Sequence, residues 1–217
     1  MTTKERRDAG GSNPPAMNLP SCRIYLRVPD GAEPEGARDC LAAALEAGEV
    51  AALLVRQDEQ EDRTVAMLEA LRALAQENNV AVILAGSDEL AQRLGADGVE
   101  VSDRAAYDVA RGRLGGSAIV GADCGTSRHF AMEAAEAGAD YVGFANGAEG
   151  GLDLVQWWGE LFEVPCVALD PVEPGQAGEL ARLGADFVRP AEAMWTSPAA
   201  AREIMSETLR AIGEAIR

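Results

Sequence analysis

Short apolar stretches alternate with longer amphipathic stretches along this chain. The apolar stretches are rich in Val, Ile, Leu and Ala, a composition typical of strands that are buried on both faces of a parallel sheet. The amphipathic stretches carry apolar residues three and four positions apart, which is the helical period. The pattern predicts strands at 23–28, 51–55, 80–85, 98–101, 118–122, 141–144, 165–169 and 186–189. It predicts helices at about 35–47, 61–78, 87–94, 103–113, 127–137, 152–162, 175–183 and 197–216.

Eight strand-helix units in a chain of this length predict a single-domain α/β fold, a (βα)₈ TIM barrel. An open, doubly wound parallel sheet is the alternative, because its strands and helices would alternate in the same way.

The pattern Gly-Ala-Asp-X-Val occurs three times, at 95–99, 138–142 and 184–188. Each copy follows a helical stretch and leads into a strand, so its glycine is expected to end the helix in a left-handed conformation. In a barrel such turns lie on the face opposite the active site. We therefore expect Asp97, Asp140 and Asp186 to be structural and to lie away from the C-terminal ends of the strands.

Composition indicates one domain: of 217 residues, 47% are hydrophobic and 25% are charged. Residues 1–20 are polar and contain Gly and Pro, so we expect a disordered N-terminal tail, followed by a barrel domain at 21–217. The sequence contains no run of 18 apolar residues that would span a membrane. Four widely spaced cysteines without a secretory signal are expected to be reduced thiols, which predicts a cytoplasmic location.

The net charge is −17, from 36 acidic and 19 basic residues. Such a field repels phosphate backbones and anionic lipid surfaces, so we expect a small-molecule ligand and neither nucleic acid nor membrane as a partner. Trp157 and Trp158 are adjacent and cannot share one helical face. One is expected in the core, and the other exposed or in an interface such as that of a homodimer.

Candidate ligand-binding residues follow the predicted strands, where a barrel places its chemistry. Asp103, Asp123 and Asp170 could converge on a divalent cation, or they could cap the helices that follow. Cys124 lies near His129 in sequence and could be a nucleophile with its base, or a packing residue. The full set of candidates is Arg56, Asp88, Asp103, Asp123, Asn146, Asp170 and Arg189.

The chain resembles thiamine phosphate synthase and its relative, the thiazole tautomerase, over about residues 23–195. The resemblance is carried by "VILAGSDELAQRLGADGVEVSD" (82–103), "AIVGADCGTSRHFAMEAAEAGADYVGFANG" (118–147), "VPCVALD" (164–170) and "LGADFVRP" (183–190). The resemblance implies a (βα)₈ barrel enzyme that uses Mg²⁺ to join a pyrimidine pyrophosphate to a thiazole phosphate.

Most of the family's motif residues are replaced here. The family ends its second strand with Gln-X-Arg-X-Lys, and this chain keeps Arg56 but has Leu54 and Asp58 at the other two positions. The histidine of the family's GADGVH is Glu100. The Thr-X-Thr-Lys that follows the sixth strand has no counterpart. The remaining substitutions are Ala85-Gly86 for an Asn-Asp pair, Ala105 for a metal-binding aspartate with Asp103 as the nearest substitute, Asp123 for a serine, Asp170-Pro171 for a double glycine and Asn146 for the tautomerase's histidine.

A pyrophosphate needs cations or backbone N–H groups around it, and these substitutions reduce both. The sequence favours a family member with a degenerate site that binds another ligand or a partner. An active thiamine phosphate synthase with remodelled contacts, and a carboxylate- or metal-dependent enzyme of another class, stay open as alternatives. Mg²⁺ is expected only if the family chemistry is retained, and Asp103 is then the candidate metal ligand. We expect the purified protein not to make thiamine phosphate at the family's rate.

Overall fold

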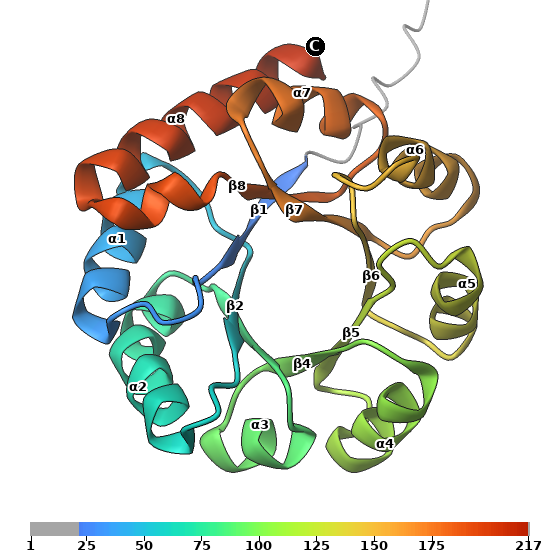
Figure 1. Ribbon diagram of the computed structural model, residues 1–217, viewed down its shortest axis with the longest axis horizontal. Coiled ribbons are helices and arrows are strands. Elements are labelled where there is room, and N and C mark those ends of the chain that lie inside the picture. Colours follow the sequence, from blue (N-terminus) through green and yellow to red (C-terminus); the bar gives the residue numbers. More distant parts are fainter. Residues whose placement is uncertain (1–21, 217) are drawn as a thin grey trace, which may run out of the picture.

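The computed structural model describes residues 22–216, and the tail expected at 1–20 lies outside the described residues. Eight parallel strands pair in sequence order, and β8 pairs with β1 to close a barrel. Figure 1 looks along this barrel, with the strands as an inner ring and the helices around them. The closed ring confirms the (βα)₈ prediction against the open sheet.

The elements follow the predicted alternation throughout. The strands are β1 Arg23–Arg27, β2 Ala52–Arg56, β3 Ala81–Ala85, β4 Gly98–Val101, β5 Ile119–Asp123, β6 Tyr141–Phe144, β7 Cys166–Val172 and β8 Phe187–Pro190. The α-helices are α1 Pro34–Ala47, α2 Glu61–Glu77, α3 Asp88–Leu94, α4 Arg104–Leu114, α5 Arg128–Glu136, α6 Gly151–Leu161, α7 Pro174–Arg182 and α8 Pro198–Ala215, with a 3₁₀ helix, η1, at Glu192–Thr196. Among the described residues, no helix is both long enough and apolar enough to cross a bilayer.

Strand β7 is longer than the sequence predicts. The predicted strand ended at Leu169, before an Asp-Pro pair that reads as a turn. In the structure, the register between β7 and β8 shifts after Ala168, and Pro171 and Val172 then pair with Arg189 and Pro190. A bulge of this kind accommodates proline, so the strand continues to the rim of the barrel.

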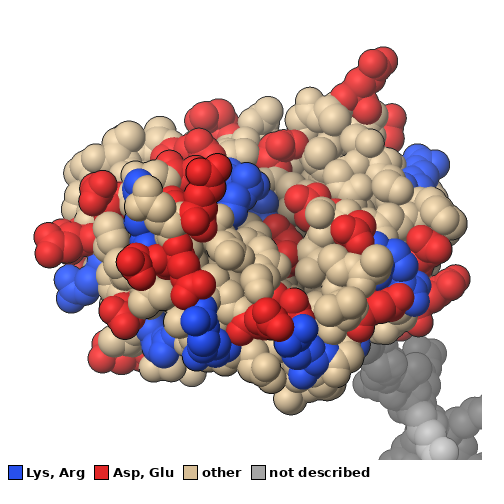
Figure 2. All heavy atoms as spheres, turned by 60° about the horizontal axis from the view of Figure 1, so that its bottom comes forward, with Lys and Arg blue, Asp and Glu red and all other residues tan. Residues whose placement is uncertain are grey.

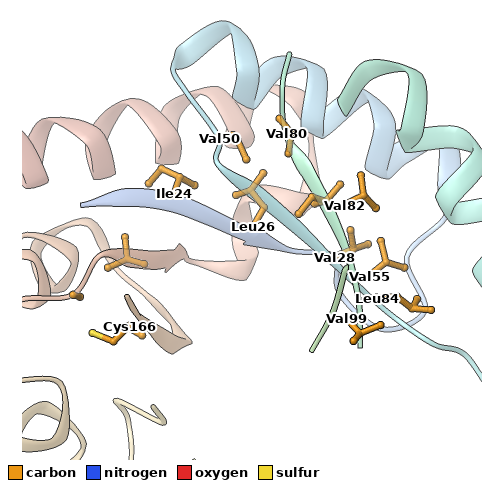
Figure 3. Packing of buried hydrophobic residues seen from close by; sticks show 14 of the residues in the cluster. Ile24, Leu26, Val28, Val50, Val55, Val80, Val82, Leu84, Val99 and Cys166 are labelled. Carbon is orange, nitrogen blue, oxygen red and sulfur yellow. The ribbon is translucent and has the colours of Figure 1, made fainter. Parts of the chain in front are cut away.

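Alternate residues of each strand face two separate cores. One set packs between the strands and the helices, and Figure 3 shows Ile24 and Leu26 of β1 in this layer, with Val28 just after β1 and Val55 of β2. The other set fills the inside of the barrel: Tyr25, Leu54, Ile83, Tyr141, Val167 and Leu169. The period of two along a strand thus determines which side chains can reach the barrel axis.

Gly121 makes room for the ring of Tyr141 inside the barrel. A Cβ added to Gly121 would overlap the ring of Tyr141 on the neighbouring strand. The ring can therefore lie across β5 and bring its hydroxyl group to the barrel axis, where the Tyr25 hydroxyl meets it at 2.7 Å.

The three Gly-Ala-Asp repeats form one recurring structure at the N-terminal ends of the strands. Gly95, Gly138 and Gly184 all have positive φ, as expected of residues that end helices. Each aspartate is bonded twice to the first part of the preceding strand. Its N–H donates to a strand carbonyl, and its carboxylate accepts from the N–H of the same strand residue, which is Val82 for Asp97, Val120 for Asp140 and Cys166 for Asp186. The expectation that these aspartates are structural and lie away from the strand C-termini is confirmed.

The Asp186 contact gives a stability prediction. Asp186→Ala removes the acceptor at 2.8 Å from the Cys166 N–H, and we expect the free energy of unfolding to fall by about 1.5–3 kcal/mol. Urea denaturation measures the loss. Asp108→Ala, which removes an exposed partner of Arg104 on α4, is the matched control and should change stability by less than about 1 kcal/mol. Equal losses in the two variants would contradict the structural role of the repeat.

Candidate functional site

Three arginines lie on neighbouring strands at the C-terminal end of the barrel. Arg189 is on β8, Arg27 ends β1 and Arg56 ends β2, and these strands pair with one another. This end of a (βα)₈ barrel is where the fold places ligands. We call the surface formed by these strand ends the mouth.

A buried ion pair lies directly beneath the mouth. Arg189 and Glu100 of β4 approach to 3.0 Å, and their side chains are only 6% and 5% exposed. Arg189 also donates to the backbone carbonyl of Leu169 at 3.1 Å. The hydroxyl groups of Tyr141 and Tyr25 lie 3.0 Å and 3.3 Å from the same Glu100 oxygen and 2.7 Å from each other, so their two protons are shared among these three oxygens. Glu100, Arg189, Tyr25 and Tyr141 form what we call the barrel cluster.

The barrel cluster is held together by charge in a place that excludes water. Burial and the charge of Glu100 raise the pKa of both Tyr25 and Tyr141 well above the usual value, so their hydroxyl groups stay protonated and act as donors. Burial alone would lower the pKa of Arg189, but the charge and hydrogen bond of Glu100, together with Tyr25 and Tyr141, outweigh it and the net pKa is raised. The guanidinium also stacks over the ring of Tyr25, 4.8 Å from its centroid. Arg189 is therefore a fixed cation whose charge is already neutralised.

Asp123 connects the barrel cluster to the mouth. It ends β5 and is half-buried, and its carboxylate accepts the Gly125 N–H at 3.1 Å. Burial and the nearby charge of Glu100 raise the pKa of Asp123, against the opposing effect of Arg189 and Arg56. The sequence candidates Arg56, Asp123 and Arg189 are thus brought to one end of the barrel.

The other two mouth arginines are paired with carboxylates of the loops. Asp30, in the loop after β1, lies 3.1 Å from Arg27 and 3.6 Å from Arg56 through the same oxygen, Oδ2. Arg27 also pairs with Glu192 of η1 at 3.3 Å. The mouth therefore contains three arginines, each with at least one carboxylate partner.

A cavity of about 740 Å³ opens beside these pairs, between the loop after β1 and the loop after β2. Its apolar lining includes Val28, Val55 and Met67, while Asp30 and Arg56 belong to its polar lining. This volume suits a small organic molecule. Its remaining charged residues are Glu33, Asp58, Glu59, Asp62 and Arg63, so carboxylates outnumber guanidinium groups.

Two other candidates, Asn146 and Asp170, form hydrogen bonds that join the loop after β6 to strand β7. The Asn146 side chain accepts the Asp170 N–H at 2.8 Å, and the Asp170 carboxylate accepts the Gly147 N–H at 2.7 Å. These bonds fasten the loop after β6 to β7. Asp88 lies in the first turn of α3, where it pairs with Arg113 of α4. Asp103 caps α4 by accepting the Ala106 N–H at 2.8 Å.

The residues present do not fit the Mg²⁺ site that the family resemblance implies. The carboxylate positions of that site fall on Gly86 and Ala105, and the substitute Asp103 is engaged as a helix cap. Among residues 22–216, no three His, Cys, Asp or Glu side chains come together in a way that could hold a metal ion.

Cys124 and His129 do not form a nucleophile and base. Burial raises the pKa of Cys124 to about 12, and its thiol donates to the Ala122 carbonyl. His129 is 81% exposed on α5 and pairs with Glu133 instead. A protonated, buried thiol is a packing group.

The surface around the barrel carries the acidic excess of the composition. On the face shown in Figure 2, acidic side chains are widespread and the arginines lie between them singly or in small groups. Ion pairs between exposed residues, such as Arg93 with Glu61 and Arg104 with Asp108, neutralise several of these arginines.

Sequence reasoning missed Arg27, Asp30, Tyr25 and Tyr141, and it identified Glu100 only as the replacement of a family histidine. A signal for most of them was present. In β1, Arg23, Tyr25 and Arg27 alternate with Ile24 and Leu26, and in β4 Glu100 stands between Val99 and Val101. Because the apolar set faces the helices, the intervening residues had to face the barrel axis.

The barrel cluster gives a second stability prediction. Glu100→Gln or Arg189→Met alone leaves one buried charge without its partner, and we expect each to lower the free energy of unfolding by about 3–5 kcal/mol. The double variant removes both charges and should recover most of the loss. A denaturation cycle of the four proteins measures the coupling. Additive losses would contradict a paired role for the two residues.

Known proteins agree with this architecture and show the family. Residues 24–193 match the sequence model of the family TMP-TENI, described as thiamine monophosphate synthase. The chain is 39% identical to the thiamine-phosphate synthase of Rhodospirillum centenum over 192 residues, covering 83% of this chain and 93% of the relative. It is 39% identical to that of Erythrobacter litoralis over 171 residues, covering 72% of this chain and 80% of the relative. The thiamine phosphate pyrophosphorylase of Pyrococcus furiosus has the same fold, with a TM-score of 0.76 at 22% identity over 92% of this chain and 99% of that one. The chain therefore belongs to the thiamine monophosphate synthase family.

Proposed function

We propose that this protein binds a neutral or cationic small molecule at the mouth and has lost the pyrophosphate-displacing reaction of thiamine phosphate synthase. Its family and its relatives support a role in thiamine biosynthesis, and the proposal concerns what the mouth does within that role. The ligand would lie in the cavity between the loops after β1 and β2, against the apolar side chains of Val28 and Val55.

The conformation after β7 carries the proposal. Phosphate groups in (βα)₈ barrels are commonly bound there by backbone N–H groups of a turn and a helix N-terminus. Here β7 continues to Val172, and Pro171 and Pro174 have no N–H. The N–H of Glu173, just before α7, donates to the Gln176 side chain at 3.1 Å. Asp170 adds a negative charge at the same place, so a phosphate would meet repulsion and few free donors.

The small number of cationic side chains in the barrel also supports the loss of pyrophosphate binding. Lys4 is the only lysine in the sequence, so the barrel contains none. At the position where the family has a lysine after its second strand, Asp58 accepts the Gln60 N–H at 2.9 Å and approaches Arg63 to 3.5 Å. A pyrophosphate leaving group needs compensating charge, and each well-placed donor that is lost commonly costs about 10²–10³ in rate.

An active synthase with remodelled contacts is the second candidate. It is favoured by the arginines on β8, β1 and β2 and by the 39% identity to two thiamine-phosphate synthases. In that case Arg27 and Arg56 would exchange Asp30 for the pyrophosphate, with Arg189 beneath them. The two candidates differ in whether the arginines are available to an anion.

Assembly and location stay predictions. Trp158 is buried, whereas Trp157 is partly exposed and lies 4.6 Å beneath the guanidinium of Arg128, which leaves a contact of α6 with a second copy of the chain open.

A coupled assay tests the proposed function. Purified protein is supplied with the pyrimidine pyrophosphate, the thiazole phosphate and Mg²⁺, beside the Rhodospirillum centenum enzyme as a positive control. We expect a rate at least about 10³-fold below the control, because several phosphate contacts are missing. A thermal-shift series should then show a higher Tm with thiamine, whose thiazolium ring is cationic, and none with pyrophosphate. Turnover within about tenfold of the control would favour the remodelled synthase instead.

A further inference from the structure

Asp30 occupies the position that an anionic ligand would take between two arginines. Arg27 on β1 and Arg56 on β2 both approach its Oδ2 atom, at 3.1 and 3.6 Å. Two guanidinium groups from adjacent strands that converge on a single oxygen form the geometry with which proteins bind carboxylates and phosphates. Here the oxygen belongs to the protein itself.

The loop that carries Asp30 is built to hold it there. The Ala32 N–H donates to the Pro29 carbonyl at 3.2 Å, which closes a four-residue turn from Pro29 to Ala32. Gly31 has a φ of +78°, the conformation that the third residue of a type II turn requires. The turn follows β1 directly, so the carboxylate lies within reach of the residue that ends the strand.

Asp30 also borders the cavity in which we place the ligand. Both Asp30 and Arg56 line it, so a ligand that enters meets an arginine whose charge is already balanced.

The geometry points to Asp30 as the residue that sets the charge specificity of the mouth: it acts as an internal anion that neutralises Arg27 and Arg56, so that neutral and cationic ligands are accepted and phosphates are rejected. This inference rests on the proposed function, because it explains the preference that the proposal assigns to the same site. It predicts that a change at one loop residue reverses the preference.

Isothermal titration of the full chain with inorganic pyrophosphate and with thiamine tests the inference. Asp30→Asn frees both arginines while the turn keeps a side chain of the same shape. We expect it to bind pyrophosphate at least about tenfold more tightly than the original protein, and to bind thiamine more weakly. Asp39→Asn is the matched control, since it makes the same change of net charge at an exposed residue of α1 that pairs with Arg38. The control should behave as the original protein does.

A double variant shows whether the gain comes from the arginines. Asp30→Asn/Arg56→Gln should lose most of the gained pyrophosphate affinity, because one of the two guanidinium groups is gone. The inference is overturned if Asp30→Asn and Asp39→Asn bind pyrophosphate equally well, or if the original protein binds it as tightly as Asp30→Asn. Those outcomes differ from failure of the proposed function, which is turnover by the unaltered protein in the coupled assay.

Discussion

The buried pair of Glu100 and Arg189 is the interaction on which the rest of the mouth depends. A charge inside a barrel needs a partner and hydrogen bonds to its remaining atoms, and here Tyr25, Tyr141 and the Leu169 carbonyl provide several of these bonds, although the Arg189 Nε atom has none among the described residues. Meeting these needs determines neighbouring residues: Gly121 must lack a Cβ so that the Tyr141 ring can lie across β5. The pair lies below the mouth, and the cavity of about 740 Å³ lies beside it, between the loops after β1 and β2. Nearer the surface, Asp30 forms ion pairs with Arg27 and Arg56 and balances their charge in the same way.

The stabilising turns and the candidate binding site lie at opposite ends of the barrel. At the N-terminal ends of the strands, the three repeated aspartates bond to the preceding strands and hold the helix-to-strand turns in place. At the C-terminal ends, an aspartate again bonds to a backbone N–H, as Asp170 does to that of Gly147, but there it joins a loop to a strand. The three turns thus belong to the structure of the barrel, and residues at the opposite end can change without disturbing them.

The sequence predicted the fold better than the site, for physical reasons. Strand and helix periods and the Gly-Ala-Asp turns depend on local geometry, so the elements could be placed without knowing their neighbours. The extension of β7 depends on pairing with β8 across a bulge, and no local pattern indicates that Pro171 pairs with Arg189. For Asp103 and Asn146 the sequence left both roles open, because polar residues after strands serve as caps and as binding groups, and the structure shows the hydrogen bonds that each makes within the protein. Arg27 could have been found from the alternation within β1, but its pairing with Asp30 and Glu192 requires the loops to be in place.

The central claim is that the mouth arginines of the unaltered protein are not available to an anion. Nuclear magnetic resonance of the arginine Nε–H groups, labelled with ¹⁵N and followed during a titration with pyrophosphate, measures this availability directly. Variants at Arg27, Arg56 and Arg189 assign the three signals. The account predicts that these signals stay in place up to millimolar pyrophosphate, since carboxylates of the protein already balance each guanidinium. Saturable shifts of the three signals at micromolar pyrophosphate would contradict it and would mean that Asp30 yields its position to the anion.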